Sequence, residues 1–379
     1  MTRIIKNIDK PLLIISIILF ALGLVTIFSA SNVTAYMLNE ADPSRYFVKE
    51  LFFLLVGVFL SYVFIHIPTS KYAYVSWFCV FILAGVIIVL SLLGQVINGM
   101  SGWLNYNGFG IQPSEFAKVA IIPLFATFYE SNFRSRDNFA KMMIPVFVAI
   151  FLMGTIVFQG DLGTAIIFMG LCILMFFFSP VSKRIKTKIF VIGMVFVGIL
   201  VLVFVCFGDK LISENKLERF NFNDPCSRYI TYGNQLCNGY IAINGGGLVG
   251  KGLGNSTQKY LYLPEAHTDF IFAIYVEETG VLGALVLFGL YFSLLVRIIV
   301  IGKRSSSIRG SLICYGVSFY IFMHIVVNLT GVVGLLPMTG VPLPFISYGG
   351  SICFCILLSL MMVQRVAYEN SRKSVRNFS

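Results

Sequence analysis

The stretch STQKYLYLPEAHTDFIFAI (residues 256–274) passes from a polar, charged segment directly into an apolar run, and this transition decides the fold. Lys259, Glu265, His267 and Asp269 lie within it, although only 12% of the chain's residues are charged. The apolar run that follows is long enough to form a membrane-spanning helix. Ionisable groups at a membrane boundary are costly, so we expect these four to serve a function there.

The composition is that of an integral membrane protein. Hydrophobic residues make up 58% of the chain, and the mean hydropathy is +0.87. The net charge of +11 does not indicate nucleic acid, because basic residues that flank apolar spans give the same sum. The eight cysteines form no CxxC motif or Cys/His cluster, so no structural metal is predicted. The sequence stays compatible with a functional divalent cation.

The apolar segments predict an all-α membrane fold with about ten transmembrane helices, at about 20 apolar residues per crossing, in one polytopic domain of residues 1–379. The predicted spans are 11–31, 50–68, 72–93, 113–130, 142–159, 162–180, 189–208, 269–296, 310–332 and 350–368. A large loop of about residues 209–268 separates the seventh span from the eighth.

The distribution of Lys and Arg predicts the orientation. Of the 28 basic residues, 19 fall on one side, in short connections and near both ends of the chain. Because such residues collect on the cytoplasmic side, both termini are predicted to be cytoplasmic and the 209–268 loop to face outward. Cys226 and Cys237 lie in this loop, where we predict a disulfide, with two free thiols as the alternative.

Two outer motifs contain candidate site residues. In QPSEFAK (112–118), Pro113 suits the first turn of a helix, and Glu115 and Lys118 then share one face and can pair. This pair either orients the helix or contacts a substrate. Trp103 is either an interfacial aromatic anchor or a functional residue.

Four further features have competing interpretations. Asp161, in the turn QGD, either caps the next helix or is functional. Glu277 and Glu278 lie inside the eighth span, where we expect at least one to form structural hydrogen bonds. The glycine-rich segment 244–254 lacks a strand–turn–helix setting, so it indicates close backbone approach rather than a nucleotide site. Segment 339–351, TGVPLPFISYGGS, predicts irregular backbone that is buried in protein or lines a cavity.

Asp269 directly precedes the apolar run at the outer mouth of the eighth span. One interpretation is a helix cap, in which the carboxylate accepts backbone N–H bonds. The other is a general base, because partial desolvation raises the pKa of a carboxyl group and makes it more basic.

Together these motifs resemble the SEDS family (shape, elongation, division and sporulation), which includes FtsW, RodA and SpoVE. The matching strings occur in the expected order over nearly the whole chain and are NG…W (98–103), QPSEFAK, QGDLGTA, STQKYLYLPEAHTDFIFAI…EETG and GLLPMTGVPLPFISYGGS. The resemblance implies a multi-pass protein of the bacterial cytoplasmic membrane that polymerises lipid II into peptidoglycan glycan strands. Its implied partners are lipid II, membrane lipids and a class B penicillin-binding protein.

The resemblance also assigns residues. Asp269 in PEAHTDF matches the family's essential acid, and Trp103 matches another required position. The string NGMSGW lacks the basic residue that many relatives have before this tryptophan. STQKYLYLPEAHTDF is similar to division or sporulation members, whereas MTGVPLPFISYGGS is similar to elongation members.

The implied reaction is an inverting glycosyl transfer in which Asp269 takes a proton from the attacking hydroxyl. The predicted substrate-binding residues are Trp103, Glu115, Lys118, Lys259 and His267. Lys118, Lys259 or Arg219 would offset the charge of the pyrophosphate leaving group. Two alternatives differ in class, namely a flippase or transporter of lipid-linked precursor, and a non-catalytic scaffold for the penicillin-binding protein, which needs no acid at position 269.

Overall fold

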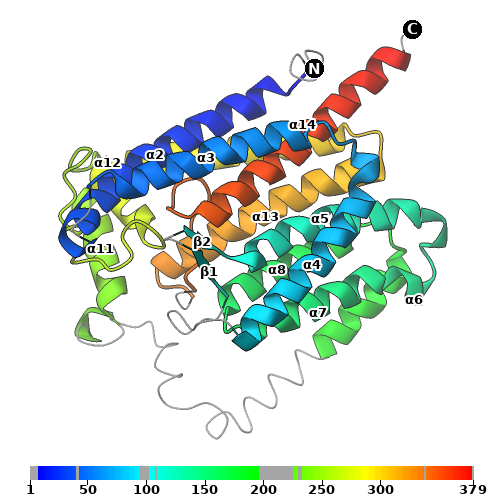
Figure 1. Cartoon of the computed structure of the whole chain (residues 1–379), viewed down its shortest axis with the longest axis horizontal. Helices are drawn as coiled ribbons and strands as arrows, with labels where there is room; N and C mark the ends of the chain where they lie inside the picture. Colours follow the sequence, from blue (N-terminus) through cyan, green and yellow to red (C-terminus); the bar gives the residue numbers. More distant parts are fainter. Residues whose placement is uncertain are drawn as a thin grey trace, which may run out of the picture.

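The computed structural model describes residues 7–39, 42–93, 102–106, 109–195, 225–228, 233–336 and 339–377. The long helices among them are α2 (Lys10–Asn39), α3 (Arg45–Phe64), α4 (Tyr72–Leu93), α5 (Pro113–Ser131), α7 (Ile144–Phe158), α8 (Leu162–Phe178), α11 (Asn234–Gly246), α12 (Ile271–Lys303), α13 (Ile308–Val332) and α14 (Gly350–Asn377). The short helices are η1 (Thr69–Lys71), η2 (Phe133–Ser135), α6 (Phe139–Met142) and η4 (Pro225–Arg228). The chain is therefore an all-α, multi-pass membrane protein (Figure 1).

Within the described ranges, seven helices are long and apolar enough to cross a membrane. Helix α8 is apolar but shorter, and α5 contains three charged residues. The seventh predicted span, 189–208, is helical up to residue 195 and then lies outside the described residues. The number of ten crossings, like the extent of the single domain, stays a prediction.

Several helices are longer than the spans predicted from hydropathy. Helix α3 begins at Arg45 rather than at residue 50, and α12 continues to Lys303 rather than ending at 296. The apolar run marks only the part of a helix that suits a membrane. Arg, Lys and Glu have good intrinsic helix propensity, so the backbone continues to form helical hydrogen bonds beyond that part.

Helices α5, α13 and α14 form the interior of the bundle, and α2, α3, α4 and α7 lie around them (Figure 1). Most positions of α5 are buried, and the four consecutive residues 121–124 are buried on every side of the helix. The outer helices instead expose large apolar side chains, such as Phe59 and Phe78. A membrane supplies an apolar solvent for such side chains, so this outer surface fits a lipid environment.

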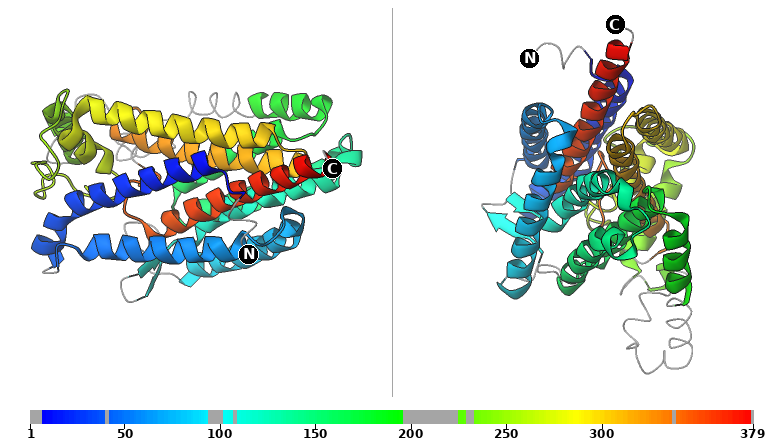
Figure 2. Two further views of the ribbon diagram at one scale, coloured as in Figure 1. Left: turned by 90° about the horizontal axis from the view of Figure 1, so that it is seen from above. Right: turned by 90° about the vertical axis from the view of Figure 1, so that its right-hand side faces the viewer.

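The start of α2 and the end of α14 lie on the same side of the molecule (Figures 1 and 2). Asp9, at the start of α2, accepts hydrogen bonds from the Arg297 guanidinium (Nη2 to Oδ2, 2.5 Å), and its backbone N–H donates to Gln364 of α14 (2.8 Å). Connections between helices at this end form similar hydrogen bonds. For example, the Thr69 hydroxyl donates to the Glu369 carboxylate (2.5 Å). The opposite end of the bundle contains the polar motifs.

A short β-hairpin, absent from the fold predicted by sequence, precedes α5 at that opposite end. Strands β1 (Leu104–Tyr106) and β2 (Phe109–Ile111) pair antiparallel, with Leu104 opposite Ile111. The backbone N–H of Gln112 then donates to the Ser351 hydroxyl at the start of α14 (2.9 Å). The hairpin thus leads directly into the contact between α5 and α14.

Helix α12 is broken at Gly280, whose φ of 71° lies in the left-handed region. The glycine-rich segment 244–254 lies against this break, and the Gly252 N–H donates to the Glu278 carbonyl (3.0 Å). A Cβ added to Gly250 would lie 2.2 Å from that carbonyl oxygen, so glycine is required there. The predicted close backbone approach is confirmed.

We expect reporter fusions at Arg136 and Lys186 to give a cytoplasmic signal and a fusion at Asn223 an external one. The reason is the basic character of the short connections on the side that holds the start of α2 and the end of α14. Paired alkaline phosphatase and fluorescent-protein fusions measure this directly. An external signal at Lys186 contradicts the orientation.

Candidate functional site

Most of the irregular segment 339–349 is buried between helices, and residues 339–341 line a small pocket, which confirms the prediction that this backbone is buried in protein or lines a cavity. The Tyr291 hydroxyl of α12 donates to the Pro344 carbonyl (2.6 Å), and the Gly349 N–H donates to the Glu50 carboxylate of α3 (3.1 Å). In α2, a Cβ added to Gly23 would lie 1.9 Å from the Phe345 carbonyl oxygen. Three helices therefore fix the path of this segment.

Segment 339–349 and α13 together hold the backbone that carries Asp269. The Tyr348 N–H donates to the His267 carbonyl (3.0 Å), and the Ser347 hydroxyl donates to the Thr268 carbonyl (2.7 Å). The Asn328 side chain donates to the Asp269 carbonyl (2.9 Å). Three consecutive carbonyls are thus fixed by residues distant in the sequence, which places the Asp269 side chain reproducibly.

Asp269 does not cap the helix that it precedes, so that interpretation is wrong. The N-cap position of α12 is Phe270, and no side chain caps the helix. The Asp269 carboxylate accepts no hydrogen bond from the described residues, and it lies beside a small pocket lined in part by Asn328, Thr339 and Gly340. A Cβ added to Gly340 would lie 3.5 Å from Asp269 Oδ2, so the residue facing the carboxylate is small.

The surroundings of Asp269 favour a proton acceptor. Burial, and to a smaller extent the nearby Glu265 carboxylate, raises its pKa to about 7. His267, two residues away, contacts the rings of Tyr46 (centroids 4.6 Å apart) and Tyr348 (5.9 Å). Burial lowers the pKa of His267, so its ring is neutral near pH 7. A carboxyl group with this pKa can accept a proton and release it again near neutral pH.

We expect activity that depends on Asp269 to rise with pH, with a midpoint at about 7. The base form is present above this pKa and is lost below it. Glu265→Gln removes the neighbouring charge, so the pKa of Asp269 falls and the midpoint moves to lower pH. The pH profile of kcat/KM measures the shift. An unchanged midpoint in Glu265→Gln would show that the titrating group is not Asp269.

Glu115 and Lys118 form the predicted pair, deep between α5 and α13. Lys118 Nζ lies 2.6 Å from Glu115 Oε1 and 3.0 Å from His324 Nε2, and the Lys118 side chain is 0% exposed. Since the ammonium group only donates, His324 Nε2 is the acceptor. One helical turn further along α13, Asn328 holds the Asp269 carbonyl. Helix α13 therefore connects the ion pair to Asp269, while direct contact of the pair with a substrate stays a prediction.

Lys259 also has a carboxylate partner. Its Nζ lies 3.5 Å from Glu278 Oε1 and donates to the Gly254 carbonyl (2.6 Å), and its side chain is 2% exposed. Glu278 accepts in addition from the Ser29 hydroxyl of α2 (2.5 Å). Its neighbour Glu277 pairs with Lys251 (2.5 Å). The predicted structural hydrogen bonding is confirmed for both acids, and substrate binding by Lys259 stays a prediction.

Two of the remaining sequence candidates, Asp161 and Trp103, lie at the same end of the bundle. Asp161 caps α8 by accepting from the Thr164 N–H (3.0 Å), as its structural interpretation predicted. Trp103 is half-buried directly before β1, and its role stays a prediction. Arg219 lies outside the described residues.

Within the 209–268 loop, the predicted disulfide between Cys226 and Cys237 is confirmed. It joins η4 to α11.

His324 and Asn328 are not among the site residues predicted from the sequence, although each has a clear signal. Both are strongly polar residues inside the span 310–332, which has no Asp, Glu, Lys or Arg. Polar side chains at such positions usually face the bundle interior and have a specific partner. Their partners, Lys118 and the Asp269 carbonyl, become visible only in the fold.

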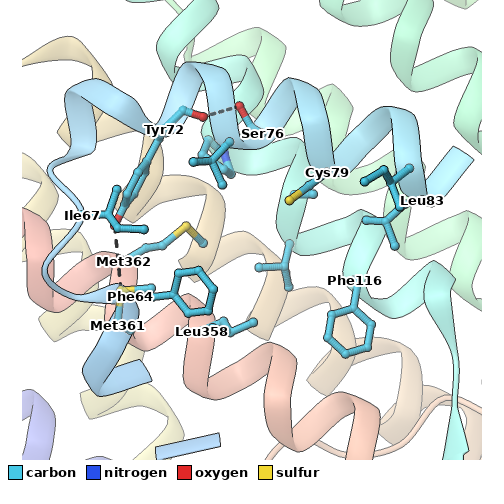
Figure 3. A pocket seen from close by; sticks show the side chains of 15 residues that line it. Phe64, Ile67, Tyr72, Ser76, Cys79, Leu83, Phe116, Leu358, Met361 and Met362 are labelled. Carbon is cyan, nitrogen blue, oxygen red and sulfur yellow. Dashed lines mark hydrogen bonds between the residues drawn. The ribbon is translucent and has the colours of Figure 1, made fainter. Parts of the chain in front are cut away.

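Two apolar grooves open beside α14 in the part of the chain that the structure describes. One encloses about 320 Å³ and is lined by α4, α5, α14 and the end of α3, including Phe64, Cys79 and Phe116 (Figure 3). The other encloses about 410 Å³ and is lined by α2, α3 and α14. Grooves of this composition suit hydrocarbon chains.

Known proteins share the sequence pattern of this chain over nearly its whole length. A family model described as cell cycle protein (FtsW, RodA and SpoVE) matches residues 10–372. The probable peptidoglycan glycosyltransferase FtsW of Bacillus subtilis is 32% identical, over 98% of this chain and 94% of that protein. Stage V sporulation protein E of the same bacterium is 33% identical, over 95% of this chain and 96% of that protein.

Solved structures share the fold. A chain from a study of structural coordination of polymerization and crosslinking by a peptidoglycan synthase complex superposes with a TM-score of 0.76 at 22% identity, covering 96% of this chain and 98% of that one. The rod shape determining protein RodA of Thermus thermophilus superposes with a TM-score of 0.67 at 21% identity, covering 96% and 97%.

Proposed function

Because the chain belongs to the FtsW, RodA and SpoVE family of cell cycle proteins, we propose that it is a peptidoglycan glycosyltransferase. It polymerises lipid II into glycan strands at the outer face of the bacterial cytoplasmic membrane, with both termini in the cytoplasm. Relatives that match over nearly the whole chain and are named as probable peptidoglycan glycosyltransferases support this activity.

The observation that carries the proposal is the state of the Asp269 carboxylate. It is free of helix capping, has a pKa of about 7 raised by burial, and lies on a backbone fixed at three consecutive carbonyls. Preorganised groups of matched pKa are what general-base catalysis needs.

The reaction is a single displacement with inversion. The 4-hydroxyl of the acceptor's GlcNAc attacks the anomeric carbon of the donor's MurNAc, and a new glycosidic C–O bond forms. The bond from that carbon to the pyrophosphate breaks, so undecaprenyl pyrophosphate leaves with the bonding electrons. Asp269 takes the hydroxyl proton, which contributes typically about 10²–10⁴-fold to such reactions.

The pyrophosphate needs positive charge, but two of the lysines predicted to supply it are already paired. Lys118 and Lys259 each have a carboxylate partner. We assign them to holding the site in shape, and Trp103 and His267 to contacting the sugar. No group of three or more His, Cys, Asp or Glu side chains suited to a metal occurs among the described residues. A divalent cation would therefore bind mainly to the phosphates of the substrate and arrive with it, as Mg²⁺ commonly does.

We assign two further partners. The first is membrane lipid, because the two apolar grooves beside α14 suit hydrocarbon chains, including the polyprenyl chains of the two substrates. A class B penicillin-binding protein would cross-link the strands, and the fold shared with a chain of a peptidoglycan synthase complex supports this pairing.

Purified protein incubated with labelled lipid II tests the activity. We expect glycan strands that a muramidase digests, alone or after addition of the partner transpeptidase. Intact lipid II under both conditions, with folded protein, would refute the proposal.

A lipid-linked precursor flippase is the second candidate, favoured by the break in α12 and by the buried Glu115–Lys118 pair. Transporters use broken helices and buried charges in this way. Reconstitution in vesicles separates the functions, because a flippase moves labelled lipid II between leaflets without forming polymer. A non-catalytic scaffold would do neither.

A further inference from the structure

Asn328 lies on α13 beside Asp269, and both residues line the same small pocket. Its side chain is 4% exposed. Nδ2 donates to the carbonyl of Asp269 (2.9 Å) and to the carbonyl of Val341 (2.8 Å). The amide therefore joins the start of α12 to the irregular segment 339–349.

These two bonds also fix which way the amide faces. An Asn side chain has two N–H donors and one carbonyl oxygen. Since two backbone carbonyls lie within hydrogen-bond distance on one side, the NH₂ group must face them, and an oxygen there would be repelled. Both donors of Asn328 are then used, and Oδ1 faces the other way.

Oδ1 of Asn328 is buried and accepts no hydrogen bond from the described part of the chain. Buried polar atoms in proteins are nearly always paired, and Asn328 lines the pocket, so its unpaired acceptor indicates a partner that supplies a donor. The pocket belongs to the Asp269 site, where the proposed substrate presents sugar hydroxyls and acetamido N–H groups.

We propose that Asn328 is a substrate-binding residue of this site, in which Oδ1 accepts a hydrogen bond from an O–H or N–H group of the sugar positioned against Asp269. The same side chain positions Asp269 through Nδ2. This inference rests on the proposed function and adds a contact to it. Loss of the acceptor weakens substrate binding, whereas loss of the two donors alters the placement of Asp269 and lowers turnover.

Binding of labelled lipid II to protein carrying Asp269→Asn, which prevents turnover, tests the contact. Asn328→Leu removes acceptor and donors at similar volume. We expect it to raise the Kd about five- to tenfold, the usual worth of one hydrogen bond to a buried partner. Asn328→Asp keeps an acceptor oxygen. At about pH 6 its buried carboxyl stays protonated and donates to one of the two carbonyls, so we expect a Kd within about twofold of the parent.

Asn238→Leu is the matched control. Asn238 is equally buried, and its Nδ2 also makes two hydrogen bonds, to the Tyr262 carbonyl (2.6 Å) and to Asn234 (2.7 Å), but it does not line the pocket. We expect it to lower thermal stability about as much as Asn328→Leu while leaving the Kd unchanged. If Asn328→Leu does not fold, Asn328→Ala replaces it.

Two outcomes overturn the proposed contact. One is a Kd in Asn328→Leu equal to that of the parent protein, which carries Asp269→Asn alone. The other is equally weak binding in Asn328→Asp and Asn328→Leu. The second would assign the effect to the lost Nδ2 donors rather than to the Oδ1 acceptor. The proposed function fails separately, if unmodified protein binds lipid II but makes no glycan.

Discussion

Asp269→Asn is expected to lower glycan synthesis by about two orders of magnitude or more, the scale of a lost general base. The change keeps the size and shape of the side chain and removes its basicity. Because α12 is not capped by Asp269, the substitution removes no helix-stabilising bond from the described residues. Expression, thermal stability and binding of the partner transpeptidase should therefore stay close to wild type.

Asp161→Asn is the appropriate control for this experiment. Asp161 does cap a helix, through the Thr164 N–H (3.0 Å), and Asn caps about as well as Asp. We expect polymerisation to remain in Asp161→Asn and to be lost in Asp269→Asn, at matched amounts of folded protein. Near-wild-type synthesis by Asp269→Asn would refute the catalytic assignment.

These two aspartates show how far local sequence can predict a site. Each directly precedes an apolar run, so each is compatible with capping and with function. Only the fold separates them. Asp161 meets the first turn of α8, whereas the turn at Glu265, with φ of 53°, and the contacts of segment 339–349 place Asp269 before the cap position of α12. Hydropathy predicts that a helix exists. Which residue caps it changes when the helix begins one or two residues earlier or later.

The charged residues likewise include one pair that local sequence predicts and one that only the fold shows. The Glu115–Lys118 pair is predictable, because residues three apart on a helix are neighbours. The Lys259–Glu278 pair is not, because it depends on how segment 247–254 folds back onto the break in α12. The sequence therefore suggests free cations for a pyrophosphate at two positions where the structure has ion pairs.

Lys118→Met is expected to lower the free energy of unfolding by about 3–5 kcal/mol, the usual cost of removing one partner from a buried ion pair. The methionine fills a similar volume, so packing changes little. It leaves the Glu115 carboxylate buried without its cation and His324 Nε2 without its donor. Unfolding in increasing concentrations of SDS, monitored by protease sensitivity, measures the loss.

The double variant Glu115→Gln/Lys118→Met distinguishes folding from catalysis. It removes both charges together, so most of the lost stability should return, because a buried pair replaced by neutral groups of similar size is often nearly as stable. We expect its polymerisation to stay well below wild type, because α13 then lacks the Lys118 contact at His324, one turn from the residue that holds Asp269. Full recovery of synthesis would assign the pair to folding alone, and a double variant as unstable as Lys118→Met would show that the charges are not what the two helices need.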